Sequence, residues 1–93
     1  MLDRKARKDY GELRRQGYGP KADEILMQLQ TDPFEPPYEK LSGEYRGFYS
    51  RRVNRTDRVV YEIREGEGPD GTDAVVVARM RTHYRGMLSL LML

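Results

Sequence analysis

The chain has 93 residues, with 17 lysines and arginines against 15 aspartates and glutamates, and no cysteine. This length predicts a single domain over residues 1–93, and the missing cysteines exclude disulfides, thiolate metal ligands and a cysteine nucleophile. Because no apolar stretch approaches the roughly 18 residues of a membrane span and the charged start lacks a secretion signal, we expect a cytoplasmic protein with no membrane partner.

The first half of the chain has the apolar spacing of two helices. A helix over 4–16 is predicted because apolar residues recur there at spacings of four and three. Asp3 stands at its N-cap position and Gly17 at its C-cap. A second helix is predicted over 21–31, where apolar residues follow the i, i+3, i+4, i+7 pattern. The stripes of such an αα-hairpin need a sheet to cover them.

Beyond the proline-rich segment "DPFEPPY" the apolar period changes to two, which predicts strands separated by a turn at "NRTD". The last run, "DAVVVARM", is almost continuously apolar, so we expect it to lie centrally in the sheet. The predicted strands are 39–44, 45–53, 58–63 and 73–80. The predicted fold class is therefore α+β, an N-terminal αα-hairpin packed on a small antiparallel β-sheet.

Charge is segregated along the second half of the chain. Between Tyr45 and Arg64 there are six arginines and two acidic residues, whereas the next stretch, "EGEGPDGTD", has four acidic residues and no basic one. Such segregation favours a polyanionic partner for the basic part. The alternative is that the charged residues cover a solvent-exposed sheet face, and charge alone leaves both open.

Few side chains can perform chemistry. With His83 as the only histidine and no cysteine, neither a tetrahedral zinc site nor another metal centre is expected. No glycine-rich phosphate loop is present, so no cofactor is expected, and Ser42, Ser50 and Ser89 lack the flanking residues of a serine nucleophile. Metal-free RNA cleavage remains, and a glutamate, a histidine and arginines are a sufficient set for it.

Adjacent strands would let Glu39, the arginine pair 51–52 and His83 converge on one face of the sheet. The competing interpretation is that His83 is a surface or cap residue and that Glu39 and Lys40 form a solvated pair. Five aromatic residues are expected in core or cross-strand packing, although one or two of them could stack a base. They are Tyr38, Tyr45, Phe48, Tyr49 and Tyr61.

Several motifs in a fixed order resemble one known family. "DPF", "PPYEKL", "YSRRVN", "RVVYEI" and "HY" are similar to the YoeB/Txe toxins of the RelE superfamily, the toxin halves of bacterial type II toxin–antitoxin modules. The similarity runs from about Ala6 to Tyr84. It implies a RelE-like fold and a ribosome-dependent endoribonuclease that cuts mRNA in the ribosomal A site and so inhibits translation.

The same resemblance implies roles for single residues. Glu39 matches the general base, Arg58 the phosphate-stabilising arginine and His83 the general acid, with Tyr84 beside it. Arg52 matches the arginine that assists substrate binding. Together with the other basic residues of this region, the residues expected to bind RNA are Arg51, Arg52, Arg55 and Lys40. The expected partners are mRNA on the ribosome and a YefM-like antitoxin whose acidic tail folds over the basic groove, with operator DNA reached only through the antitoxin complex.

Three features depart from the family pattern. Asp57 replaces the usual histidine before Arg58, where it could hold Arg58 in a salt bridge or weaken its pull on phosphate. The family's first strand is reduced to Met1–Leu2, unless the start is truncated. An apolar C-terminal extension, 85–93, could cover that strand's position, form a homodimer contact or crowd Tyr84. These features keep two alternatives open: a weak or inactive module that represses its operon with the antitoxin, and a general RNA-binding domain.

Overall fold

The computed structural model describes residues 2–81, and its order of elements is two helices followed by four strands. The helices are α1 (Arg4–Arg15) and α2 (Gly19–Thr31), and the strands are β1 (Glu39–Lys40), β2 (Phe48–Arg52), β3 (Arg58–Arg64) and β4 (Ala74–Arg79). Two short 3₁₀ helices, η1 (Gly43–Tyr45) and η2 (Pro69–Gly71), interrupt the loops. The α+β prediction is confirmed.

Local chemistry explains where both helices begin and end. The Asp3 carboxylate accepts a hydrogen bond from the Arg4 amide at 2.7 Å and caps α1. Gly17, at φ +90°, turns the chain after α1. Pro20 occupies the first turn of α2, where its missing N–H has no intrahelical partner to lose. Both predicted helices are confirmed, although α2 starts two residues earlier than expected.

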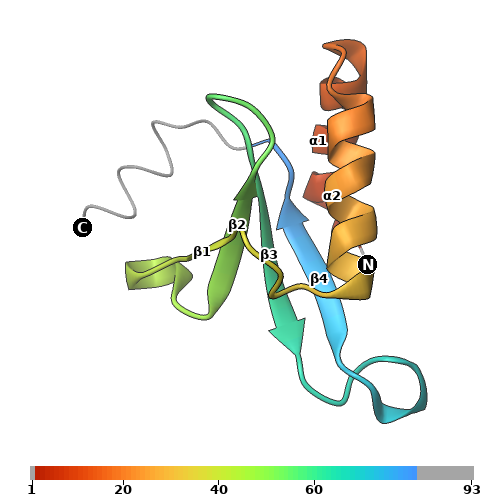
Figure 1. The fold of residues 1–93 in the computed structure, drawn as a ribbon, viewed down its shortest axis with the longest axis vertical. Helices are drawn as coiled ribbons and strands as arrows, with labels where there is room; N and C mark the ends of the chain where they lie inside the picture. Colours follow the sequence, from red (N-terminus) through yellow and green to blue (C-terminus); the bar gives the residue numbers. More distant parts are fainter. Residues whose placement is uncertain (1, 82–93) are drawn as a thin grey trace.

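The four strands form one antiparallel sheet in the order β1-β2-β3-β4. Both helices pack on one side of it, and β1 with η1 lies on the opposite side (Figure 1). In β3, Val59 and Tyr61 belong to the core between helices and sheet, whereas Val60 packs with Leu41 in a smaller cluster on the other face. Cross-strand pairing therefore divides β2 and β3 into a helix-covered face and an open face.

Two strand predictions are wrong. The strand expected over 39–44 pairs at only two residues, because Gly43 adopts φ +65° and starts η1. β4 is an edge strand, not the central one: among residues 2–81 it pairs with β3 alone, and its outer edge meets the chain start through the Leu2–Val77 bridge and the Asp3 amide, which donates to the Val77 carbonyl. α1 buries one face of β4 and neighbouring side chains bury the other. This burial explains the apolar run without a central position in the sheet.

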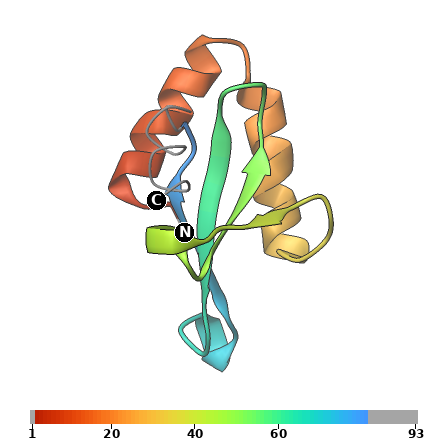
Figure 2. The same cartoon turned by 90° about the vertical axis from the view of Figure 1, so that its left-hand side faces the viewer.

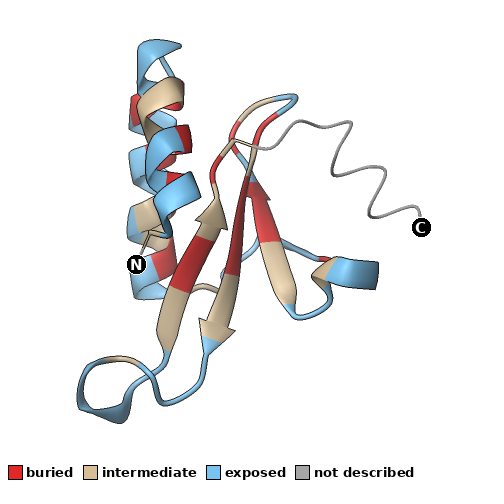
Figure 3. Ribbon diagram, turned by 180° about the vertical axis from the view of Figure 1, so that it is seen from behind, coloured by how far each residue is buried: buried red, intermediate tan, exposed pale blue. Residues whose placement is uncertain are grey.

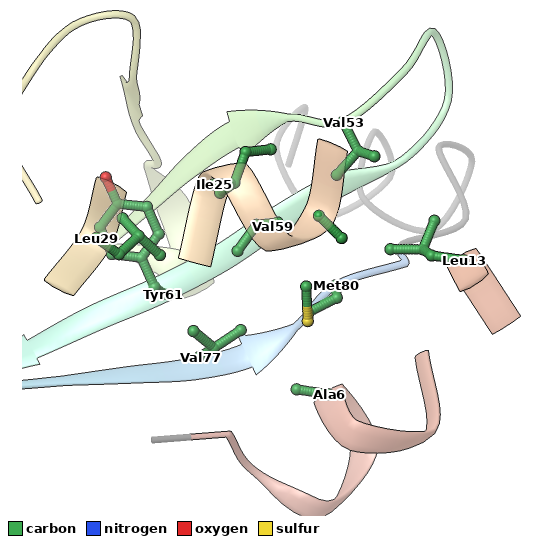
Figure 4. Close-up of a cluster of buried hydrophobic side chains, with 10 residues drawn as sticks. Ala6, Leu13, Ile25, Leu29, Val53, Val59, Tyr61, Val77 and Met80 are labelled. Atoms are coloured by element: carbon green, nitrogen blue, oxygen red, sulfur yellow. The ribbon is translucent and has the colours of Figure 1, made fainter. Parts of the chain in front are cut away.

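The core lies between the helix pair and the sheet (Figure 4). Its largest fully buried side chains include Tyr61 and Leu13, while the outward faces of both helices are exposed (Figure 3). Within the described part of the chain, no helix is long and apolar enough to cross a membrane.

A buried carboxylate fastens the end of β4 to α1. Asp9 is 8% exposed and accepts hydrogen bonds from Arg79 Nε at 2.7 Å and from the backbone amides of Met80 and Arg81 at 3.1 and 3.2 Å. The hydrogen bond to Asp9 raises the pKa of Arg79. Asp9 therefore supplies the acceptor for the backbone amides where the chain leaves β4.

We expect Asp9→Ala to lower the free energy of unfolding by roughly 2–3 kcal/mol, because the buried amide of Met80 and the partly buried amide of Arg81 lose their acceptor. Asp9→Asn keeps one acceptor oxygen and should lose about half as much. Denaturant unfolding followed by circular dichroism measures both. Asp23→Ala, which removes an exposed acceptor of the Tyr10 hydroxyl, is the control. An Asp9→Ala chain that unfolds at the wild-type midpoint would contradict the anchoring role.

Candidate active site

The register of the sheet brings four polar side chains onto its open face. Glu39 pairs with Ser50, and Arg52 pairs with Arg58 across β2 and β3. Directly opposite residues point to the same face, so β1, β2 and β3 each contribute to one cluster. We call Glu39, Ser50, Arg52 and Arg58 the open-face cluster.

Glu39 and Arg58 are in direct contact. Arg58 Nη1 donates to Glu39 Oε2 at 2.9 Å and to Ser50 Oγ at 3.2 Å. The Arg58 side chain is only 14% exposed, whereas that of Glu39 is 62% exposed. The cation is thus held in place by the sheet, and within residues 2–81 the second carboxylate oxygen of Glu39 accepts no hydrogen bond. Such a pair can take up a proton and hold negative phosphate oxygens.

Glu39 and Ser50 differ in burial. Most of the Glu39 side chain meets solvent. Ser50, by contrast, is fully buried and was considered only as a nucleophile. Its spacing of two residues from Arg52 in a strand was the signal that could have placed it beside the arginines.

The remaining cations predicted to bind RNA lie in different places. Arg55 is exposed in the turn between β2 and β3, and Lys40 is exposed and paired in register with Tyr49, on the face opposite to Glu39. Arg51 is 7% exposed and lies on the helix-covered face beside Val59. The structure therefore brings Arg58 into contact with Glu39 and places Arg52 beside Arg58 on the same face. Arg51 and Lys40 belong to the other face, although Arg51 lines the same cavity as Glu39 and Arg52.

Arg51 instead holds the proline-rich segment that precedes Glu39. Its Nη2 donates to the carbonyl oxygen of Glu35, and the Tyr61 hydroxyl donates to that of Pro33 at 2.8 Å. Burial raises the pKa of Tyr61, an effect that the nearby Arg51 guanidinium partly offsets. These two contacts fix the backbone that leads into β1. Burial leaves Arg51 little surface on which to meet a phosphate.

The aromatic residues pack on one another, as predicted. Tyr49 stacks on Tyr61 with ring centroids 5.7 Å apart, and Tyr38 meets Tyr49 edge-on at 5.8 Å. Tyr45 and Phe48 form a separate edge-on pair at 5.9 Å on the open face. The first group packs under the proline-rich segment and supports β1 from the helix-covered side.

Within the described residues, Asp57 does not form the salt bridge with Arg58 that was considered for it. Its carboxylate accepts from Asn54 Nδ2 at 2.9 Å and lies 3.9 Å from Arg81 Nε, whereas Arg58 pairs with Glu39. Asn54 Oδ1 in turn accepts from the Asp57 amide at 2.8 Å and closes the turn. Asp57 is 6% exposed, so it is a buried part of the turn that also contacts the end of the described chain.

His83, Tyr84 and the segment 85–93 lie outside the described residues. The last described residue, Arg81, contacts Asp57, the neighbour of Arg58 in sequence. A cavity of about 420 Å³ also opens beside the cluster, between α2, the proline-rich segment and β2, with Glu39, Ser50 and Arg52 in its lining. This volume is within the usual range of ligand pockets, about 300–1,000 Å³.

Comparison with protein families gives one match over most of the chain. Residues 4–84 match the model of the YoeB-like toxin of bacterial type II toxin–antitoxin systems. Toxin YoeB of Mycobacterium bovis and Toxin RelK of Mycobacterium tuberculosis are each 34% identical to it over 62 residues. Those alignments cover 64% of this chain and 65% of each relative, so the chain spans less than two thirds of these relatives' length.

Solved structures with the same fold cover 90% of the chain. The YoeB/ParE toxin from Agrobacterium tumefaciens superimposes with a TM-score of 0.74 at 24% identity, over 96% of its own length. A chain of the YoeB–YefM complex from Staphylococcus aureus superimposes with a TM-score of 0.69 at 26% identity. The YoeB dimer from the same organism gives a TM-score of 0.67 at 25% identity. Each of these two chains is covered over 94% of its length.

Proposed function

The chain belongs to the family of YoeB-like toxins of bacterial type II toxin–antitoxin systems, and from this premise we propose that it is a ribosome-dependent endoribonuclease that cuts mRNA in the ribosomal A site. The observation that carries the proposal is the Glu39–Arg58 pair on the open face of the sheet, 2.9 Å apart. It puts a proton acceptor next to an immobilised cation, two of the groups that cleavage at a ribose 2′-hydroxyl uses.

In the proposed reaction, Glu39 takes the proton of the 2′-hydroxyl and the resulting oxygen attacks the adjacent phosphorus. Arg58 holds the phosphate oxygens as they gain negative charge, assisted by Arg52, and Arg58 exchanges its contact with Glu39 for one with phosphate. The bond to the 5′-oxygen breaks, and His83 donates the proton that this leaving oxygen needs, with Tyr84 beside it. The products are a 2′,3′-cyclic phosphate and a free 5′-hydroxyl. The adjoining cavity offers room for a neighbouring nucleotide.

The proposal includes a partner that keeps the enzyme silent. One of the similar structures is a YoeB–YefM complex, and another is a YoeB dimer. For this chain we extend the pairing to a YefM-like antitoxin whose acidic segment covers the exposed Arg52 and Arg55. Operator DNA would be bound through that complex, and the toxin itself would act in the cytoplasm.

The reaction class can be tested with the 2′-hydroxyl itself. Ribosomes programmed with a short mRNA are mixed with the purified chain, and the same mRNA is made with one 2′-deoxynucleotide at the cut position. We expect cleavage of the first mRNA to a 2′,3′-cyclic phosphate and none of the second at that position, because the nucleophile is missing.

Equal cutting of the deoxy substrate would contradict the mechanism. Cutting of free RNA as fast as ribosome-bound mRNA would contradict the dependence on ribosomes. An intact mRNA, together with operator binding by the toxin–antitoxin complex, would support the inactive repressor instead.

A further inference from the structure

A strongly basic surface lies on α1, away from the open-face cluster. At 3.6 residues per turn, its members fall within an arc of about 120° directly opposite the buried residues Ala6 and Leu13. The basic face of α1 consists of Arg4, Arg7, Lys8, Arg14 and Arg15, with Gly11 at its centre. All five cations are exposed. Seen from the side of β1, α1 lies beside and behind the sheet (Figure 2). Because Ala6 and Leu13 face the core on the helix-covered side, the opposite face of α1 points away from the sheet, whereas the open-face cluster lies on the other side of it.

The sign of these charges is unusual for an ordinary solvated helix face. Arg4 has like-charged neighbours three and four residues on, Arg7 and Lys8, and such pairs destabilise a helix. The first turn of α1 contains no acidic residue, so the cations also oppose the helix dipole. Within residues 2–81, none of these three side chains is ion-paired with a carboxylate. Glu12 attracts Lys8 and pairs with Arg15, but within the described residues no carboxylate forms an ion pair with Arg4, Arg7 or Arg14.

Gly11 adds an independent observation. It sits in the interior of α1, where glycine is a poor helix former. A Cβ built there would meet nothing closer than Arg15 Nη1 at 4.0 Å, so packing within the described chain does not require glycine. A missing side chain at the centre of a surface does, however, allow another backbone to approach closely.

We propose that the basic face of α1 docks on the phosphate backbone of structured ribosomal RNA, while the open-face cluster engages mRNA. The cations complement a row of phosphates, and Gly11 lets the backbone come close between them. A second copy of the chain does not fit, because ten cations would meet across a two-fold contact. This inference rests on the proposed function, since that function brings the chain to a surface made of RNA.

The test is the salt dependence of binding to purified ribosomes. The double variant Arg7→Gln/Lys8→Gln is compared with Lys5→Gln/Arg46→Gln, which removes two exposed cations from outside the basic face. We expect the first variant to bind about three- to tenfold more weakly and to lower the slope of log affinity against log salt by about two. The control should keep the wild-type slope. Cleavage at saturating enzyme should be unchanged, with the loss confined to KM.

Gly11→Ala and Gly11→Leu give a readout that unfolding cannot imitate. Gly11→Ala should raise the melting temperature, since alanine favours the helix, while ribosome binding weakens, and Gly11→Leu should weaken it further. Wild-type affinity and slope in the Gly11 and Arg7/Lys8 variants would overturn the inference. The inference would also be overturned if these variants lost binding to the acidic antitoxin segment but kept their binding to ribosomes. A wild-type chain that binds ribosomes without cutting mRNA refutes the proposed function alone, because binding still reports on α1.

Discussion

Replacing Glu39 by glutamine is expected to slow mRNA cleavage on the ribosome by a factor on the order of 10²–10⁴, the usual contribution of a general base. The amide keeps the size of the side chain but cannot accept the 2′-hydroxyl proton. The Glu39 side chain is 62% exposed, so the fold should tolerate the change. Single-turnover cleavage of mRNA on programmed ribosomes measures the rate, and denaturant unfolding measures the stability.

The chain contains a matched control at the other end of β3. There Arg64 pairs with Glu62, as Arg58 pairs with Glu39. Glu62→Gln removes the same charge and an equivalent ion pair, and should leave cleavage unchanged. If Glu39→Gln cuts mRNA as fast as this control, Glu39 is not the base.

Replacing Arg58 by glutamine should reduce cleavage by about 10²–10³-fold, the typical cost of losing one well-placed group that stabilises transition-state charge. The loss should appear mainly in the cleavage rate at saturation, because phosphate charge grows as the reaction proceeds. Arg58→Lys keeps the charge but not the planar fork and should fall between glutamine and wild type. The measurement is single-turnover cleavage over a range of enzyme concentrations.

Arg64→Gln is the control for this series, since it breaks the equivalent ion pair away from the cluster. A loss of equal size in Arg58→Gln and Arg64→Gln would mean that the strand, and not the phosphate contact, is being damaged. A purely KM effect in Arg58→Gln would assign Arg58 to substrate binding instead of catalysis.

Much of the architecture could be predicted because its signals are local. Apolar residues at helical spacing gave α1 and α2, and Asn54 with Asp57 indicated the turn between β2 and β3. Alternation assigned Val59 and Tyr61 to the core face. The position of β4 was not predictable in this way, because a continuous apolar run reports burial, which α1 supplies at a sheet edge as well as a neighbouring strand does.

The candidate site was only partly predictable. The motif resemblance singled out Glu39 and Arg58, but their contact joins residues 19 apart and depends on the pairing register of three strands. Arg51 and Arg52 look equivalent as neighbours in the sequence. Strand alternation separates them, so that Arg51 supports the proline-rich segment and Arg52 faces the open side.

The sequence by itself determined the two helices, the turn between β2 and β3 and the family, and it singled out Glu39, Arg58 and His83 as candidate reactive side chains, because helix periodicity, turn chemistry and spaced motifs are readable over short distances. Only the tertiary structure decided which charges meet. Asp57 lies close to Arg81, Asp9 binds Arg79 at a strand end 70 residues away, and Arg58 pairs with Glu39. The physical reason is that an ion pair depends on the face and register of each side chain, which are fixed when distant segments pack around a common core.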